Sequence, residues 1–316
     1  MRNHGQFNAL IAPALRSIAY IHQSHVFKAY CALENLFALK PQLSESVWAY
    51  CRSLIKDDEP KVDGVIAPAL YNIEEIVDAT SGRDFGPDWI LGRGLMPLSY
   101  WALQQKVDDI GFDAVFENYL EQALDKPMFL GHEISVLAGN WRFYTDVVKE
   151  SSEAECHRLF EQRMAEFFTT TFSHGHDTTF EHPPIDTVPT HRELLQEALE
   201  NPGFFGHNVL ACVWGHRLKS VLSEEQYEKL RYNLTVLVRW HEFGQPPSRL
   251  EGLERTWSEA DFDHHLTQFF LSGPQNIHQI TLAEALCALW VEWPELSHLI
   301  AANLTCFTAG TRPCDA

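Results

Sequence analysis

Residues 204–222 read FFGHNVLACVWGHRLKSVL, and this stretch decides the fold class. From residue 208 onward, apolar side chains recur every three to four positions, which is the periodicity of an amphipathic α-helix. The pair Gly206-His207 stands directly before the helix. The same F-x-G-H pattern occurs earlier, where residues 129–136 read FLGHEISV and contain Gly131-His132. Two explanations are open: a duplicated helix start, or a pair of metal ligands.

Helical periodicity continues through most of the chain. Runs of this kind cover 15–39, 46–55, 112–124, 133–148, 154–168, 192–200, 208–222, 225–243 and 280–293. Ser152, Thr190 and Ser223 each stand three residues before a Glu or Gln, the spacing of a helix-capping box. Regions rich in Pro and Gly, at 81–97, 173–189 and 244–252, are expected to be loops. The sequence therefore predicts an all-α protein.

The chain is also expected to contain a diverged internal repeat. With 316 residues and 45% apolar residues, it is long enough for one large helical domain, here 1–316. The two F-x-G-H segments each follow a Pro-containing turn, and each has an arginine ten residues after the histidine, Arg142 and Arg217. Repeat-like units are expected near 15–55, 112–170, 190–243 and 262–310.

Two further histidines share a weaker pattern. His25 and His278 are each followed by Ala-Leu seven and eight residues later, at Ala32-Leu33 and Ala285-Leu286. Small residues, among them Gly139 in the helix after His132, come one or two turns after all four histidines. Small side chains let helices approach closely, so residues from different helices could meet at one centre.

Composition excludes several partners. The chain has 24 Lys+Arg and 43 Asp+Glu, and a net charge of −19 opposes binding to nucleic acid or to anionic membranes. No apolar run reaches about 18 residues, and the N-terminus lacks a signal-peptide pattern. The seven cysteines show no C-x-x-C spacing, and Cys31, Cys212 and Cys287 lie in apolar runs. We expect a reduced, cytoplasmic protein without a thiolate zinc site.

Four helix-borne histidines form a candidate metal site. Neutral imidazole binds iron, zinc and copper, and helical bundles build such sites from side chains on facing helices. His25, His132, His207 and His278 are the candidate ligands, and their thiol-free set suits non-haem iron better than structural zinc. The alternative for each is a buried histidine whose hydrogen bonds are satisfied within the core.

Other candidates are weaker. Arg142 and Arg217 are candidate catalytic residues that could orient an anionic substrate, or they could pair with carboxylates at helix ends. The segment SHGHDTTFEHPP carries His174, His176 and His182, with His191 nearby, and could bind a metal as a hydrolase does. Signature motifs of serine hydrolases, P-loop proteins and dinucleotide-binding folds are absent from the sequence.

Two stretches resemble a known family. HVFKAYCALENLFALKPQL and PQNIHQITLAEALCALW resemble histidine helices of the questin oxidase-like proteins, which are helical non-haem iron oxygenases of polyketide anthraquinones. The two Gly-His units look like the intervening histidine helices. The resemblance implies that His25, His132, His207 and His278 bind one iron ion. The lysine modified in some members has no counterpart within a turn after His207 or His278, and Lys28 is the only lysine close to a proposed ligand.

The expected function is oxidation of a small organic molecule by a mononuclear non-haem iron centre that uses O₂. Ring cleavage or oxygen insertion is what the resemblance implies, and the substrate could be aromatic or polyketide-like. Two alternatives remain open: a metal-dependent hydrolase using the loop from His174 to His182, and a helical interaction protein without enzymatic activity.

Overall fold

The computed structural model describes residues 6–19, 24–66, 86–126, 129–173, 182–240, 249–254, 256–273 and 275–308. Within these ranges the α-helices are α1 Ile11–Leu15, α2 Val26–Leu39, α3 Glu45–Asp57, α5 Pro87–Gly92, α6 Leu98–Asp125, α7 His132–Phe143, α8 Ala154–Phe172, α9 His191–Glu200, α10 His207–Arg217, α11 Glu224–Arg239, α12 Glu259–Ser272, α13 His278–Glu292 and α14 Ser297–Thr308. The β-type pairing found in these ranges is an isolated bridge between Ser17 and Lys61. The all-α prediction is confirmed.

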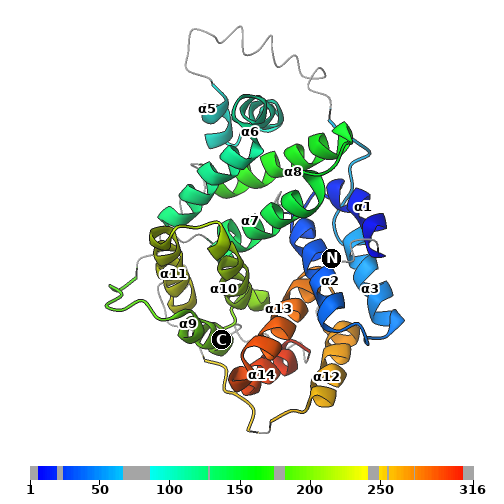
Figure 1. The fold of residues 1–316 in the computed structure, drawn as a ribbon, viewed down its shortest axis with the longest axis vertical. Coiled ribbons are helices and arrows are strands. Elements are labelled where there is room, and N and C mark those ends of the chain that lie inside the picture. Colours follow the sequence, from blue (N-terminus) through cyan, green and yellow to red (C-terminus); the bar gives the residue numbers. More distant parts are fainter. Residues whose placement is uncertain are drawn as a thin grey trace.

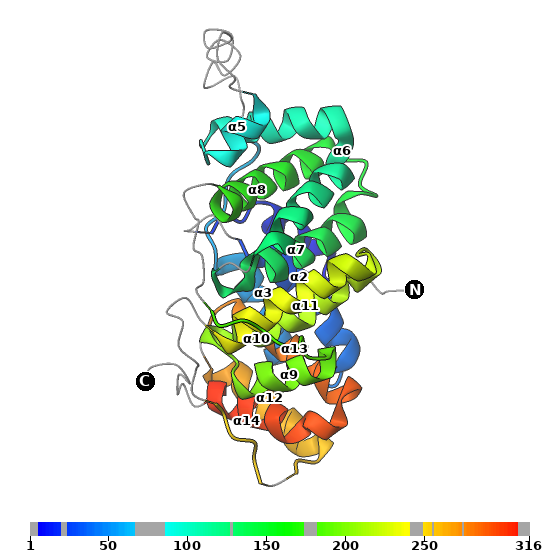
Figure 2. The same cartoon turned by 90° about the vertical axis from the view of Figure 1, so that its left-hand side faces the viewer.

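The helices stack along the long axis of the molecule, with α5 and α6 at one end and α12 and α14 at the other (Figure 2). One hydrophobic core cluster contains residues from both of these ends and from the helices between them. Cys31, Cys212 and Cys287 are buried in this core, as predicted. No helix in the described parts of the chain has the length and apolar character needed to cross a membrane.

Four helices form the centre of the molecule. Helix α2 packs against α7 and α13, and α10 packs against the same two helices, which makes a closed ring. Figure 1 shows α7, α2, α13 and α10 around the middle of the ribbon. Gly139 lets α7 approach α2 closely, because a Cβ atom there would lie 2.7 Å from the Cα atom of Lys28. The small residues noted in the sequence therefore serve helix packing.

Three local predictions were wrong. The run 15–39 is two helices, because the backbone of Arg16 and Ile18 is hydrogen-bonded to residues 60 and 62 and leaves the helical conformation. The region 81–97 contains α5, whose first residue is Pro87. Ser152 makes no capping box, since α8 begins at Ala154 and Glu153 takes the N-cap position.

The other two capping boxes are confirmed. Thr190 accepts a hydrogen bond from the backbone of Glu193, and Ser223 accepts one from Gln226, with the reciprocal bonds also present. The internal repeat as a whole stays a prediction. What the structure shows is that its two F-x-G-H segments have the same backbone conformation, described next.

Candidate metal centre

Each of the four candidate histidines stands at the start of a central helix. His25 is the N-cap of α2, and His132, His207 and His278 are the first residues of α7, α10 and α13. Since these helices form a closed ring, their N-terminal ends bring the histidines together. The sequence predicted that the histidines lie in helical runs; their common position at the helix starts is what makes the cluster.

Backbone geometry fixes where α7 and α10 begin. Leu130 and Gly131 have φ angles of 59° and 64°, and Phe205 and Gly206 have φ angles of 48° and 75°. Two consecutive left-handed residues therefore precede His132 and His207. For Leu and Phe this conformation costs on the order of 1–3 kcal/mol, and such strain is concentrated at functional sites. The glycines avoid the cost, and a Cβ atom on Gly206 would lie 2.7 Å from Leu282.

Side chains fix the starts of α2 and α13. The carboxylate of Glu59 accepts hydrogen bonds from the backbone N–H of His25, at 3.1 Å, and from the hydroxyl of Ser24, at 2.7 Å. Asn276 Oδ1 accepts the backbone N–H of His278 at 3.0 Å. Glu59 was not identified from the sequence, because it lies 34 residues from His25 and no local pattern links them.

The four imidazole rings form a quadrilateral. Neighbouring ring centroids are 4.7 Å apart for His25–His132, 5.0 Å for His132–His207, 5.1 Å for His207–His278 and 4.6 Å for His278–His25. The diagonal from His25 to His207 is longer, at 6.4 Å. The Nε2 atom of His132 lies 3.1 Å from that of His25 and 3.0 Å from that of His207. All four side chains that the sequence predicted as ligands thus meet at one centre.

Burial keeps these imidazoles neutral. Desolvation lowers the pKa of His207 to about 4, and nearby Lys28 contributes to that lowering of the pKa. Burial also lowers the pKa values of His25, His132 and His278 well below the ordinary value, with further lowering by the neighbouring histidines. Neutral imidazole is the form that binds a metal ion.

Hydrogen bonding orients at least one ring. Nδ1 of His207 contacts the backbone carbonyl of Phe204. Because a carbonyl only accepts, Nδ1 carries the hydrogen and Nε2 presents its lone pair to the centre, as in many metal-binding histidines. Phe205 stacks on the ring of His278 with 5.5 Å between centroids. These aromatic side chains belong to the F-x-G-H segment itself.

The donor set fits a metal ion on two observations. Nε2 of His278 is buried without a hydrogen-bond partner among the described residues. Nε2 of His132 faces the Nε2 atoms of His25 and His207, and since a ring nitrogen carries either one hydrogen or one lone pair, it can make a well-directed hydrogen bond with only one of them. A cation that accepts all of these lone pairs would remove this deficit. The ligand atoms of His25, His132 and His207 lie within 4.8 Å of one another, as a shared ion requires.

The four rings differ in how closely their ligand atoms approach. The ligand atoms that all lie within 4.8 Å of one another belong to His25, His132 and His207. The ring of His278 lies beside them, with its centroid 4.6 Å from that of His25 and 5.1 Å from that of His207. An ion would therefore be held first by His25, His132 and His207, and a histidine set without thiolate suits iron or copper.

A buried amine lies directly beneath the histidines. Lys28 is fully buried one turn after His25, and its Nζ donates to Ser135 Oγ at 3.4 Å. Ser135 in turn stands three residues after His132. Burial lowers the pKa of Lys28 to about 7. The sequence identified Lys28 by its proximity to His25 alone; the structure adds that its charge acts on all four histidines.

Arg142 and Arg217 lie at the other ends of α7 and α10. Ten residues of helix place each about 15 Å from its histidine. Both are paired with carboxylates: Arg142 Nε donates to Asp146 at 3.3 Å, and Arg217 donates to both oxygens of Glu284, at 3.0 and 2.5 Å. This pairing is the alternative that the sequence left open. A role for the arginines in orienting substrate stays a prediction.

Only part of the second histidine cluster, which runs from His174 to His191, lies within the described residues. His174 and His176 lie outside the described residues, so a metal site in that loop stays untested. His182 is described, and its Nδ1 lies 2.8 Å from the carbonyl of Pro183. His191 stacks on His216 with 3.7 Å between centroids, and His216 stands nine residues after His207 along α10, away from the four-histidine centre.

No family model, curated protein or solved structure matches the chain. The resemblance to the questin oxidase-like family therefore stays an expectation that is based on the two stretches quoted above. The feature that points to a function is the cluster of four histidines at the helix starts.

Proposed function

We propose that this protein is a mononuclear non-haem iron oxygenase that acts on a small organic molecule with O₂. The observation that carries the proposal is the convergence of four neutral histidines, one from the start of each of four helices, of which His25, His132 and His207 are buried. His25, His132, His207 and His278 are the ligands on this reading. The substrate and product classes come from the family resemblance, and the centre itself comes from the geometry.

The histidines would hold the ion through neutral nitrogen ligands, which suit iron. Bound iron would supply the oxygen chemistry. Histidine ligation without thiolate is also compatible with copper, so the choice of iron is part of the proposal.

The surrounding residues of the chain have three tasks. Glu59, Asn276 and the left-handed residues before His132 and His207 hold the imidazoles in place. The rings of Phe204 and Phe205 stack on His207 and His278 and exclude water from that side of the centre. Lys28 holds or releases a proton at Nζ beneath the histidines, where a pKa near 7 makes both states accessible. The cysteines among the described residues are free and mostly buried, which fits the expected cytoplasmic location.

The test is whether the reconstituted centre binds a diatomic ligand. Protein loaded anaerobically with Fe(II) is exposed to nitric oxide, which stands in for O₂, and examined by electron paramagnetic resonance. We expect the half-integer-spin signal of an iron–nitrosyl adduct at close to one per chain. The double variant His132→Ala/His207→Ala is expected to lose it.

Two results would reject the proposal. Iron that binds without any nitrosyl signal would mean a closed, structural centre. A signal of equal intensity in the double variant would place the metal elsewhere, for instance in the loop containing His174 and His176, as the hydrolase alternative predicts. A protein that binds no metal at all would favour the helical interaction protein.

A further inference from the structure

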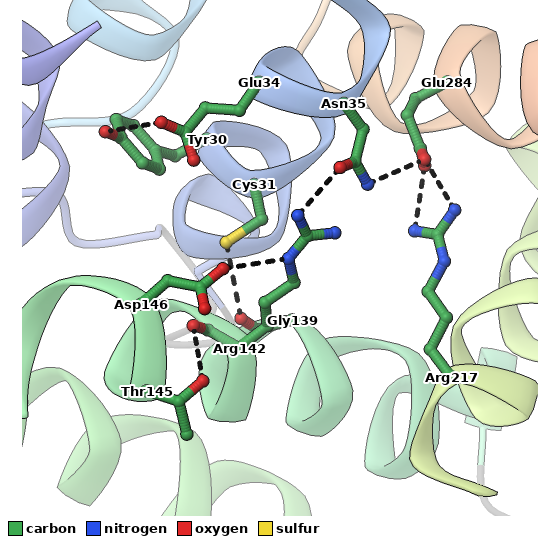
Figure 3. A network of polar contacts seen from close by, with 10 residues as sticks. All are labelled: Tyr30, Cys31, Glu34, Asn35, Gly139, Arg142, Thr145, Asp146, Arg217 and Glu284. Carbon is green, nitrogen blue, oxygen red and sulfur yellow. Dashed lines mark hydrogen bonds and ion pairs between the residues drawn. The ribbon is translucent and has the colours of Figure 1, made fainter. Parts of the chain in front are cut away.

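A second site lies at the opposite end of the same four helices. A cavity of about 560 Å³ opens there, and its lining includes Asn35 of α2, Arg142 of α7, Arg217 of α10 and Glu284 of α13. Figure 3 shows these four side chains pointing toward one another from the four helices. A volume of this size is typical of small-molecule sites.

The floor of this pocket is an ordered polar network. Glu284, only 1% exposed, accepts Asn35 Nδ2 at 3.0 Å and both terminal nitrogens of Arg217. Asn35 Oδ1 accepts Arg142 Nη2 at 2.7 Å. Two arginines face two acids, Glu284 and Asp146, in this network, and Glu292 adds a third acid to the pocket lining. Arg142 and Arg217 each stand ten residues after a candidate histidine, as noted in the sequence. Asn35 stands at the same distance after His25.

Hydrogen-bond donors remain free in this network. Arg142 Nη1 has no hydrogen-bond partner among the described residues, and Figure 3 shows it with no line to its neighbours. Trp214, which also lines the pocket and stacks under Arg217 at 4.4 Å, has a buried Nε1–H without a partner. The unpaired, buried N–H of Trp214 costs free energy, so an acceptor group of a ligand would satisfy it, and Arg142 Nη1 offers a second donor in the same pocket.

The rest of the lining is mixed. It includes the apolar side chains of Leu39, Ala288 and Val291, the last 60% exposed, together with polar Ser220 and Glu292. Directly after Arg142 the chain forms a π-helix, Tyr144–Val148, which carries the pocket residues Thr145 and Asp146. Single π-helical turns are rare and are frequent at functional sites.

We propose that this pocket binds a small monocarboxylate with an apolar body, at a site separate from the metal centre. The carboxylate accepts from Arg142 Nη1 at the floor, since a guanidinium recognises carboxylates best. The apolar body lies against the Trp214 side of the pocket and Val291. Glu284 stands six residues after His278, about 9 Å further along α13, and Arg142 and Arg217 each stand about 15 Å from their histidines, so the floor is separate from the metal centre.

Calorimetric titration of the metal-free protein tests this site. The probes are monocarboxylates of about four to twelve carbon atoms, which a pocket of this volume holds, each beside its primary amide. We expect at least one carboxylate to bind tenfold or more tightly than its amide. Arg142→Gln is expected to lower that affinity at least tenfold, and Ala288→Phe to abolish binding by filling the pocket without touching the polar network.

Two control variants distinguish carboxylate binding in this pocket from the general loss of an arginine and from loss of the metal centre. Arg239→Gln removes a comparable arginine that pairs with Glu197 outside the pocket, and it should leave carboxylate affinity unchanged. His132→Ala should also leave it unchanged, whatever happens to metal binding. Equal binding by Arg142→Gln, equal affinity for acid and amide, tighter binding of the matching amines, or no binding by any carboxylate would each overturn the proposal.

Discussion

His207 shows how burial prepares a single side chain for metal binding. Its pKa is lowered to about 4, so the folded protein keeps this imidazole neutral where an exposed histidine would be protonated. Between about pH 6.5 and pH 4, His207 is protonated in the unfolded chain and neutral in the folded chain. Stability must therefore fall as the pH falls from about 6.5 toward 4, and His207 alone contributes roughly 3 kcal/mol to this loss.

Urea unfolding of the metal-free protein at several pH values measures this effect. We expect the free energy of unfolding to decrease from about pH 6.5 downward, with a smaller pH slope in His207→Gln. His182→Gln is the control, because that half-exposed residue lies outside the centre, and it should keep the wild-type slope. Identical slopes for the wild type and His207→Gln would contradict the inferred neutral state.

Lys28 gives a prediction of the same sign in a higher pH range. Burial lowers its pKa from 10.5 to about 7, so the unfolded chain binds more protons between these values. The free energy of unfolding of the wild type should therefore rise relative to Lys28→Met as the pH increases from about 7 to 10. At pH 7 we expect Lys28→Met to be more stable than the wild type by more than about 1 kcal/mol.

Lys40 is the matched control for this substitution. It is equally inaccessible, and burial lowers its pKa, but the hydrogen bonds that Lys40 donates to Asp263 and Glu259 outweigh burial and raise that pKa above its usual value. Lys40→Met should therefore destabilise the protein in unfolding measurements. If both methionine variants shift stability in the same direction, the charge argument for Lys28 is wrong.

At the scale of helices, the contact between α2 and α7 decides whether the centre forms. Alanine at Gly139 would gain about 1 kcal/mol of helix propensity, but its Cβ would lie 2.4 Å from Lys28 Cβ and 2.7 Å from Lys28 Cα. The two helices must then separate. We expect Gly139→Ala to lose about 2 kcal/mol or more in urea unfolding and to bind iron more weakly.

Gly215→Ala is the matched helical glycine. Its nearest neighbour would be the flexible Ile134 side chain, at 3.0 Å, which can move. We expect a change within about 1 kcal/mol and full iron content. Equal losses in both variants would show that the close approach of α2 and α7 has no special role.

The helix starts show which parts of the fold can be predicted from the sequence. Periodicity predicted most helices, and F-x-G-H predicted where α7 and α10 begin. The start of α2 was not predicted, because it depends on Glu59 and on pairing of residues 16–18 with 60–62, which are distant in sequence. The pocket residues Asn35 and Glu284 were not predicted for a related reason. They form a site only because α2, α7, α10 and α13 are neighbours in the folded chain.

At the scale of the whole molecule, the four histidines connect segments from residue 25 to residue 278. A metal ion bound only by the folded chain stabilises it by mass action, by about 2.7 kcal/mol when the free ion exceeds its dissociation constant a hundredfold. We expect Fe(II) to raise the thermal unfolding midpoint under anaerobic conditions and a chelator to reverse the rise. A midpoint that does not respond to iron would contradict a centre that spans the fold.

The most direct test of the central claim is the metal content of the purified protein. Elemental analysis compares the wild type with His132→Ala/His207→Ala and with His191→Ala/His216→Ala, a control that removes two histidines stacked on each other elsewhere. We predict close to one iron per chain in the wild type and in the control, and almost none in the first double variant. Equal metal in all three proteins, or none in any, would contradict a metal centre at the four helix starts.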